Sequence, residues 1–199
     1  QRQSPKIYTT DPTRNQPYAM VLRADLLMQK VVEEQLTVDS AKNIGFAFGE
    51  LQEGGIPTQK VVMNWPAATY SAEWSDQESR WLLSHNNKLN LAESGLVLGP
   101  STLVIQMVRI TPSEYGDKFG GVTPKSTVTG AGKAYFLRNG SMTEVSWSRP
   151  TAEDPTTWTL ADGTEAYFQP GQVWFFLTDQ EPEFTFPLKK SEKQSDSRN

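Results

Sequence analysis

The stretch TGAGKAYFLRNGSMTEVSW, residues Thr129 to Trp147, decides how this chain folds. Asn139-Gly140 stands between two runs in which apolar residues recur. This dipeptide favours a two-residue hairpin turn, because both central positions of such a turn need a positive φ. The stretch therefore predicts two antiparallel strands, near residues 126–138 and 141–148, joined at Asn139-Gly140.

The same stretch contains Gly130-Ala131-Gly132-Lys133, which looks like the end of a phosphate-binding loop. Such a loop has a glycine where Thr127 stands and a Ser or Thr where Ala134 stands. A helix should also follow, whereas here a hairpin turn follows. The dinucleotide fingerprint fails as well, because its third glycine is missing. The sequence argues against a nucleotide site, and no cofactor is expected.

Short apolar runs separated by turn residues extend this β pattern on both sides. TLVIQMVRI, Thr102 to Ile110, is apolar at both alternating sets of positions and predicts a central strand buried on both faces. Asp162-Gly163 and Pro170-Gly171 mark further turns, the latter before the run Val173–Thr178.

The segment ADLLMQKVVEEQL has apolar residues three and four positions apart and predicts a helix over about residues 24–36. The expected fold class is α+β and β-rich, with a mixed or antiparallel sheet of about eight to ten strands, hairpins and one packed helix.

Three segments are expected along the chain. Residues 1–17 contain several prolines among polar residues and predict an extended lead-in. Residues 18–187 form a single β-rich domain. Residues 188–199 are polar and predict a tail.

The composition restricts the chemistry. The 199 residues include no cysteine and one histidine, so disulfides, thiol nucleophiles and a multi-histidine zinc site within the chain are excluded, and no metal is expected. The net charge of −4 lacks the basic excess of a nucleic-acid-binding surface. No run of about 18 apolar residues is present, so no transmembrane segment is expected.

Aromatic residues cluster in the first half of the chain. Trp65, Trp74 and Trp81, together with His85, are candidates for a surface that binds a ligand or a partner. The alternative for the tryptophans is core packing, which is the more common fate of such residues. His85 is a candidate general base, against the alternative of an exposed histidine in a turn.

Carboxylates beside tryptophans suggest chemistry on glycans. Glu73 and Asp76 flank Trp74, and Glu144 lies near Trp147. The alternative is that these acids are solvated surface residues, because strand alternation places Glu144 opposite to the apolar positions around it.

The ordered motifs resemble the C-terminal domain of the YerB-like family, a family of bacterial lipoproteins that contains a domain of unknown function (DUF3048). The resemblance covers about residues 68–178 and includes the turn Asp162-Gly163 and Gln172. The other family-motif positions, expected to be structural, are Gly130, Gly132, Lys133, Asn139, Gly140, Trp147, Gly171 and Trp174.

This resemblance implies an extracytoplasmic location in association with the cell envelope, an α/β fold and no established activity. It carries over no catalytic residue. The family usually begins with another domain and a lipid-modified cysteine, so the chain corresponds to the second half of the family pattern. Docking to a missing N-terminal domain is an expectation from that pattern.

Three functional hypotheses follow. The first is a non-catalytic binding or scaffold domain of a bacterial cell-envelope protein, with an envelope protein or a cell-wall polymer as its partner. The second is an enzyme that acts on glycans or peptidoglycan through surface carboxylates. The third is a structural half of a larger two-domain protein.

Overall fold

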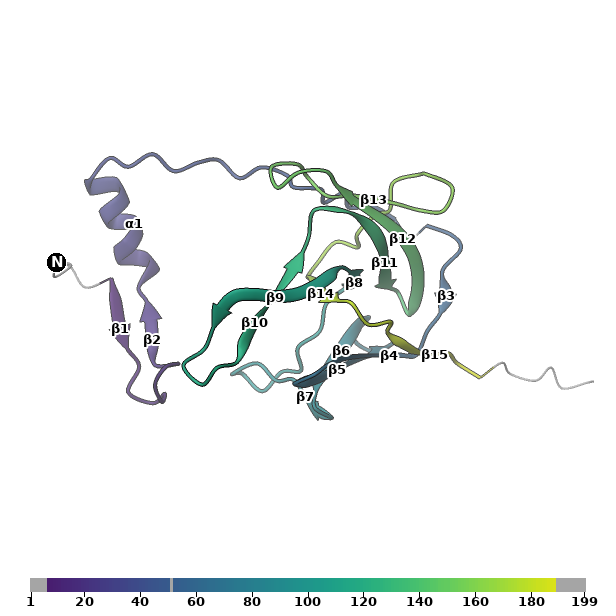
Figure 1. Ribbon diagram of the computed structural model, residues 1–199, viewed down its shortest axis with the longest axis horizontal. Coiled ribbons are helices and arrows are strands. Elements are labelled where there is room, and N and C mark those ends of the chain that lie inside the picture. The colour runs from purple at the N-terminus through teal and green to yellow at the C-terminus, as the bar shows by residue number, and fades with distance from the viewer. Residues whose placement is uncertain (1–6, 51, 189–199) are drawn as a thin grey trace, which may run out of the picture. The chain divides into compact units, whose positions relative to one another are not determined.

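The computed structural model describes residues 7–50 and 52–188 and separates into two compact units, divided between Lys42 and Asn43 (Figure 1). The described residues contain fifteen strands and one helix. Residues 1–6 of the predicted lead-in lie outside the described residues, as do residues 189–199 of the predicted tail.

The first unit is a small hairpin followed by the helix. Strands β1 (Tyr8–Thr10) and β2 (Met20–Leu22) pair antiparallel, and α1 (Ala24–Glu33) follows. The predicted helix is confirmed, although it ends at Glu33 because Gln35 adopts a positive φ of 51°. No residue of α1 is buried, and its packing against a sheet stays a prediction. Within the described residues, no helix is long and apolar enough to cross a membrane.

The second unit contains two larger sheets. The six-stranded sheet has its main strands in the order β13 (Thr157–Thr159), β12 (Ser141–Arg149), β11 (Gly130–Arg138), β8 (Thr102–Met107) and β14 (Val173–Thr178), and β3 (Ile56–Pro57) pairs with β12. The five-stranded sheet has the order β15 (Glu183–Thr185), β4 (Lys60–Trp65), β5 (Ala68–Ser75), β6 (Arg80–His85) and β7 (Lys88–Leu89). Pairing within both is antiparallel, except between β14 and β8.

The hairpin predicted at Asn139-Gly140 is confirmed. Arg138 pairs with Ser141, and the two residues between them have φ angles of 49° and 68°. These left-handed values fit Asn and Gly and produce the turn whose twist matches that of the flanking strands.

The two larger sheets pack face to face, and their side chains form the inner core. The five-stranded sheet contributes Val61, Met63, Ala72, Trp81 and Leu83; the six-stranded sheet contributes Leu103, Ile105, Tyr135, Leu137 and Met142. Alternate residues of the same central strands point to the opposite face. There Val104 and Phe136 pack with Phe168 and Trp158 in an outer core.

The strands divide among four sheets in the described part of the chain, rather than forming one. The predicted strand 102–110 is interrupted at Val108, whose amide donates to Thr178 O at 2.8 Å. Beyond it, β9 (Arg109–Gly116) pairs only with β10 (Val122–Thr127). Apolar periodicity continues through the interruption, so the sequence does not reveal it.

We predict that residues 43–188 fold without the first unit, because all members of both core clusters lie between residues 46 and 184. Deleting residues 1–42 should leave cooperative thermal unfolding in place and shift the midpoint by less than about 4 °C, the shift that roughly 1 kcal/mol produces in a domain of this size. Calorimetry of the full and shortened chains measures this. Loss of the cooperative transition would contradict it.

Candidate functional site

The central ladder of the six-stranded sheet opens near the first residues of β11. Gln106 of β8 pairs with Ala134, and the next pair along the chain joins Arg109 to Thr127. Between these pairs, Met107 and Val108 on one side face the six residues 128–133 on the other. Residues 130–133 are paired with β12 but have no ladder partner on the β8 side.

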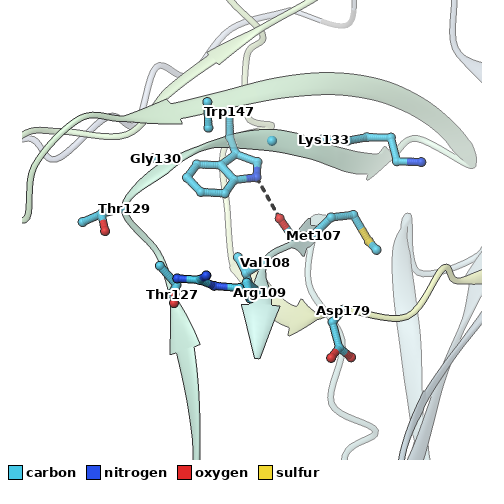
Figure 2. Close-up of a pocket in the computed structure, with 11 residues that line it drawn as sticks. Met107, Val108, Arg109, Thr127, Thr129, Gly130, Lys133, Trp147 and Asp179 are labelled. Carbon is cyan, nitrogen blue, oxygen red and sulfur yellow. Dashed lines mark hydrogen bonds between the residues drawn. The ribbon is translucent and has the colours of Figure 1, made fainter. Parts of the chain in front are cut away.

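The indole of Trp147 bridges this opening. Its Nε1–H donates to the carbonyl of Met107 at 3.0 Å, as Figure 2 shows. Trp147 pairs with Gly132 across the β11–β12 ladder and is buried in the outer core. A side-chain hydrogen bond thus takes the place of a backbone pair at the interruption.

Gly132 is required because the indole covers its backbone. A Cβ atom at this position would lie 2.8 Å from Trp147 Nε1 and 3.3 Å from Met107 O. No real Cβ sits that close to a ring atom, so any side chain would displace the ring. Gly132 of the G-x-G-K pattern is therefore explained by close packing of a side chain on a strand, with no need of a phosphate.

A cavity of about 410 Å³ lies at this opening. Its walls include residues 129–133, the Trp147 ring, Met107 and Val108, with the charged side chains of Arg109, Lys133 and Asp179 among the lining groups (Figure 2). Arg109 is exposed, and its side chain makes no hydrogen bond or ion pair with another described residue. The cavity thus offers one cation that is not neutralised by the described part of the chain.

Lys133 belongs to a polar cluster on the inner side of β11. Its Nζ donates to Glu181 Oε1 at 2.7 Å, and the Tyr135 hydroxyl donates to Glu181 Oε2 at 2.8 Å. The bond from Lys133, followed by that from Tyr135, lowers the pKa of Glu181, while Glu181 raises the pKa of Lys133. Burial raises the pKa of Tyr135. Lys133 is therefore a protonated cation at neutral pH, paired with Glu181, and not a free base.

The remaining family-motif residues have structural contacts. Gly140 lies against the ring of Trp74, since a Cβ there would meet Nε1 at 2.9 Å. Gly171 has a φ of +127° and lies in the turn before β14. Trp174 packs against the inner core.

The structure separates the four residues predicted to bind a partner into two groups. Trp81 is fully buried in the inner core, and its ring centroid lies 5.5 Å from that of Trp74. Trp74 is half-buried and donates to Asp76 Oδ1 at 2.7 Å. A side chain with no exposed surface cannot contact a partner in this conformation, so Trp81 is a core residue.

His85 and Trp65 share an aromatic row at the other end of the same sheet. The exposed ring of His85 stacks on Tyr70 at a centroid distance of 4.6 Å. Tyr70 and Trp65 both contact Phe176, and Trp65 Nε1 donates to Leu177 O at 3.1 Å. These contacts join β14 of one sheet to β4 and β5 of the other. Packing between the sheets therefore explains the presence of Trp65 and Tyr70.

Two of the three candidate acids lie on different sheets, and the third, Asp76, lies in the turn after β5. Glu73 is on β5 and Glu144 is on β12, and both are exposed; Asp76 is occupied by the Trp74 indole. In the described residues, no group of three or more His, Asp or Glu side chains is arranged to hold a metal ion.

Three important polar residues were not predicted. Glu181 and Tyr135 complete the Lys133 cluster, and Arg138 is buried, donating to Tyr167 O at 2.7 Å and Gly49 O at 3.0 Å. The spacing of Lys133 and Tyr135 on one strand face was a usable signal. The partners of Arg138 are backbone carbonyls of remote segments, for which the sequence holds no signal.

The sequence profile described as the C-terminal domain of a protein of unknown function (DUF3048) matches residues 61–175, which is more than half of the chain. The chain belongs to this family. Within the matched range lie the opening at β11, Trp147 and the Asn139-Gly140 turn, so the family profile covers the candidate site.

The structure is similar to the crystal structure of the YerB protein from Bacillus subtilis, with a TM-score of 0.67 and 13% sequence identity. The alignment covers 90% of this chain, and the chain spans 59% of that one. At this identity the likeness shows a common fold. No curated protein matches the sequence.

We predict that Gly132→Ala destabilises the protein by about 1–3 kcal/mol, because the new methyl group forces the Trp147 ring away from Met107 O. Urea unfolding measures the change. The exposed neighbour Ala131 provides the control, since Ala131→Ser should change stability by less than about 0.5 kcal/mol. An uncrowded glycine in a strand gains stability on replacement by alanine, so a neutral or positive effect of Gly132→Ala would contradict the assignment.

We predict that Glu181→Gln lowers stability at pH 7 by roughly 0.2–1 kcal/mol, the range for a pair of this exposure, since the Glu181 side chain is 62% exposed. The pKa of Glu181 is lowered by folding, so its contribution is present above the unfolded pKa of about 4.3 and is lost as the pH falls through the folded value.

Urea unfolding of the wild type and of Glu181→Gln at pH 7 and at pH 3 tests this pH dependence, with Asp179→Asn as a nearby control. The difference between wild type and Glu181→Gln should shrink at the lower pH. Equal differences at both pH values would show that the carboxylate charge is not what stabilises the cluster.

Proposed function

We propose that this chain is a non-catalytic binding domain of an extracytoplasmic protein of the cell envelope, and that its partner is another envelope protein. The envelope location rests on the family resemblance. The binding surface that we propose is the β9–β10 arm, residues 109–127, together with the cavity at its base.

The observation that carries the proposal is the exposed apolar tip of the arm. Phe119 is 84% exposed, Tyr115 is 70% exposed and Val122 is 59% exposed. The two strands of the arm pair only with each other among the described residues. An isolated two-stranded ribbon is marginally stable in water, and large apolar side chains gathered at its end favour a protein interface.

Two further features favour recognition through side chains. Pro112 and Pro124 face each other in the arm, and proline removes donors from a strand edge, which disfavours non-specific strand addition. The unpaired Arg109 at the base of the arm favours an acidic group on the partner. Arg109 and Thr127 form the last arm pair and also line the base cavity, so the two parts of the surface are continuous.

Site-specific photo-crosslinking in native cells tests this proposal. A benzoylphenylalanine placed at Phe119 should cross-link to one envelope protein. The same probe at Leu96, which is 67% exposed and lies outside the arm, should not. Arg109→Ala should weaken the cross-link from position 119 without changing the thermal midpoint.

Equal cross-linking from positions 119 and 96, or none from position 119, would overturn the arm as a binding surface. Cross-linking to wall polymer instead of protein would overturn the proposed partner.

A further inference from the structure

The outer face of the six-stranded sheet is crossed by a strap, which we define as residues 43–49. At one end, the amide of Thr156 donates to Ile44 O at 3.2 Å. At the other end, Phe168 donates to Ala47 O at 2.8 Å and Gly49 donates to Phe168 O at 3.1 Å. The buried guanidinium of Arg138 also donates to Gly49 O. The strap is therefore held over the sheet at both ends.

A cavity of about 350 Å³ lies beside the strap and is distinct from the cavity at the base of the arm. Most of its lining is apolar: Ile44 and Phe46 from the strap, Val128, Trp158, Phe175 and Leu177. Three of the rings make mutual contacts, with Phe175 lying 5.9 Å from Phe46 and 5.8 Å from Trp158. Because the rings pack against one another, they form one wall of the cavity without a bound ligand.

Three polar side chains, those of Gln106, Arg149 and Thr156, complete the lining. Gln106 lines the cavity and is only 5% exposed. It is flanked on the sheet by Ala134 on one side and Leu177 on the other, neither of which has a polar side-chain atom. Among the described residues, nothing forms a hydrogen bond with the side-chain amide of Gln106.

The amide atoms of Gln106 are not among the fully enclosed side-chain atoms that lack a hydrogen-bond partner, so the amide keeps some surface open to the cavity. A leucine at this position would continue the apolar face. The amide instead presents a donor and an acceptor to the cavity, and a ligand group can pair with either. A small-molecule site typically combines an apolar, largely preformed cavity of this size with a few polar groups that fix orientation.

We propose that this cavity binds a neutral, mainly apolar small molecule that carries one hydroxyl or carbonyl group, with that group paired to the Gln106 amide. The aromatic wall favours a planar or ring-containing body. The one charged residue of the lining, Arg149, already donates hydrogen bonds from its guanidinium to the carbonyls of Ala152 and Asp154. The mainly apolar lining favours a neutral ligand over an anion.

Calorimetric titration of the full chain with 2-naphthol, and separately with its isostere 2-methylnaphthalene, tests the proposal. The wild type should bind 2-naphthol at least about fivefold more tightly, since a hydrogen bond at a buried site gives roughly this discrimination. In Gln106→Leu this preference should disappear, and the thermal midpoint should not fall, because no protein hydrogen bond is lost. The indole N–H resonance of Trp158, assigned with Trp158→Phe, should shift on binding.

A second pair of variants tests the cavity itself. Ile44→Trp places a larger ring at the exposed edge of the strap and should weaken binding of 2-naphthol at least tenfold. Leu96→Trp adds the same ring at a similarly exposed site elsewhere and should have no effect. Absence of 2-naphthol binding at millimolar concentration, unchanged binding in Ile44→Trp, or an unchanged preference in Gln106→Leu would each overturn the proposal.

Discussion

The hydrogen bond from Trp147 Nε1 to Met107 O is the interaction on which the rest of the second unit depends. A central strand must have its backbone groups satisfied, yet the β8–β11 ladder stops at Ala134. The indole of Trp147 compensates for the missing backbone pair. Its N–H donates to the last carbonyl of β8, and its ring covers Gly132. Because the ladder opens here, the chain on either side can diverge into the β9–β10 arm while both sheets remain packed.

The same constraint relates the two cavities. Val128, at the start of the opened segment, lines the apolar cavity, whereas Thr129 to Lys133 line the polar one. Gln106 forms the last β8–β11 pair before the opening. Both the polar cavity at the base of the arm and the apolar cavity on the outer face of the sheet thus border one local departure from regular pairing. The stability of the fold and its proposed binding functions arise from the same residues.

Much of the fold was predictable from local patterns. The hairpin at Asn139-Gly140 follows from the conformational preferences of two residues, and the helix follows from its apolar spacing. The burial of Leu103 and Val104 on opposite faces follows from the consecutive apolar residues 103–105. The candidate site was harder to predict from the sequence. Gly132 and Trp147 were identified as members of a motif, but their contact joins residues on different strands. The motif alone gives no physical reason for that contact.

The sequence by itself determined the family, the β-rich class, the main hairpin and the absence of cysteine chemistry, because these depend on residue identity and on short-range periodicity. Tertiary structure alone decided where the ladder opens, that Trp81 is buried while Phe119 is exposed, and that Glu181 meets Lys133. It also decided that Gln106 lies unpaired in an apolar cavity. The physical reason is that these properties depend on which distant segments cover each strand, and a local pattern is the same whether or not such a segment is there.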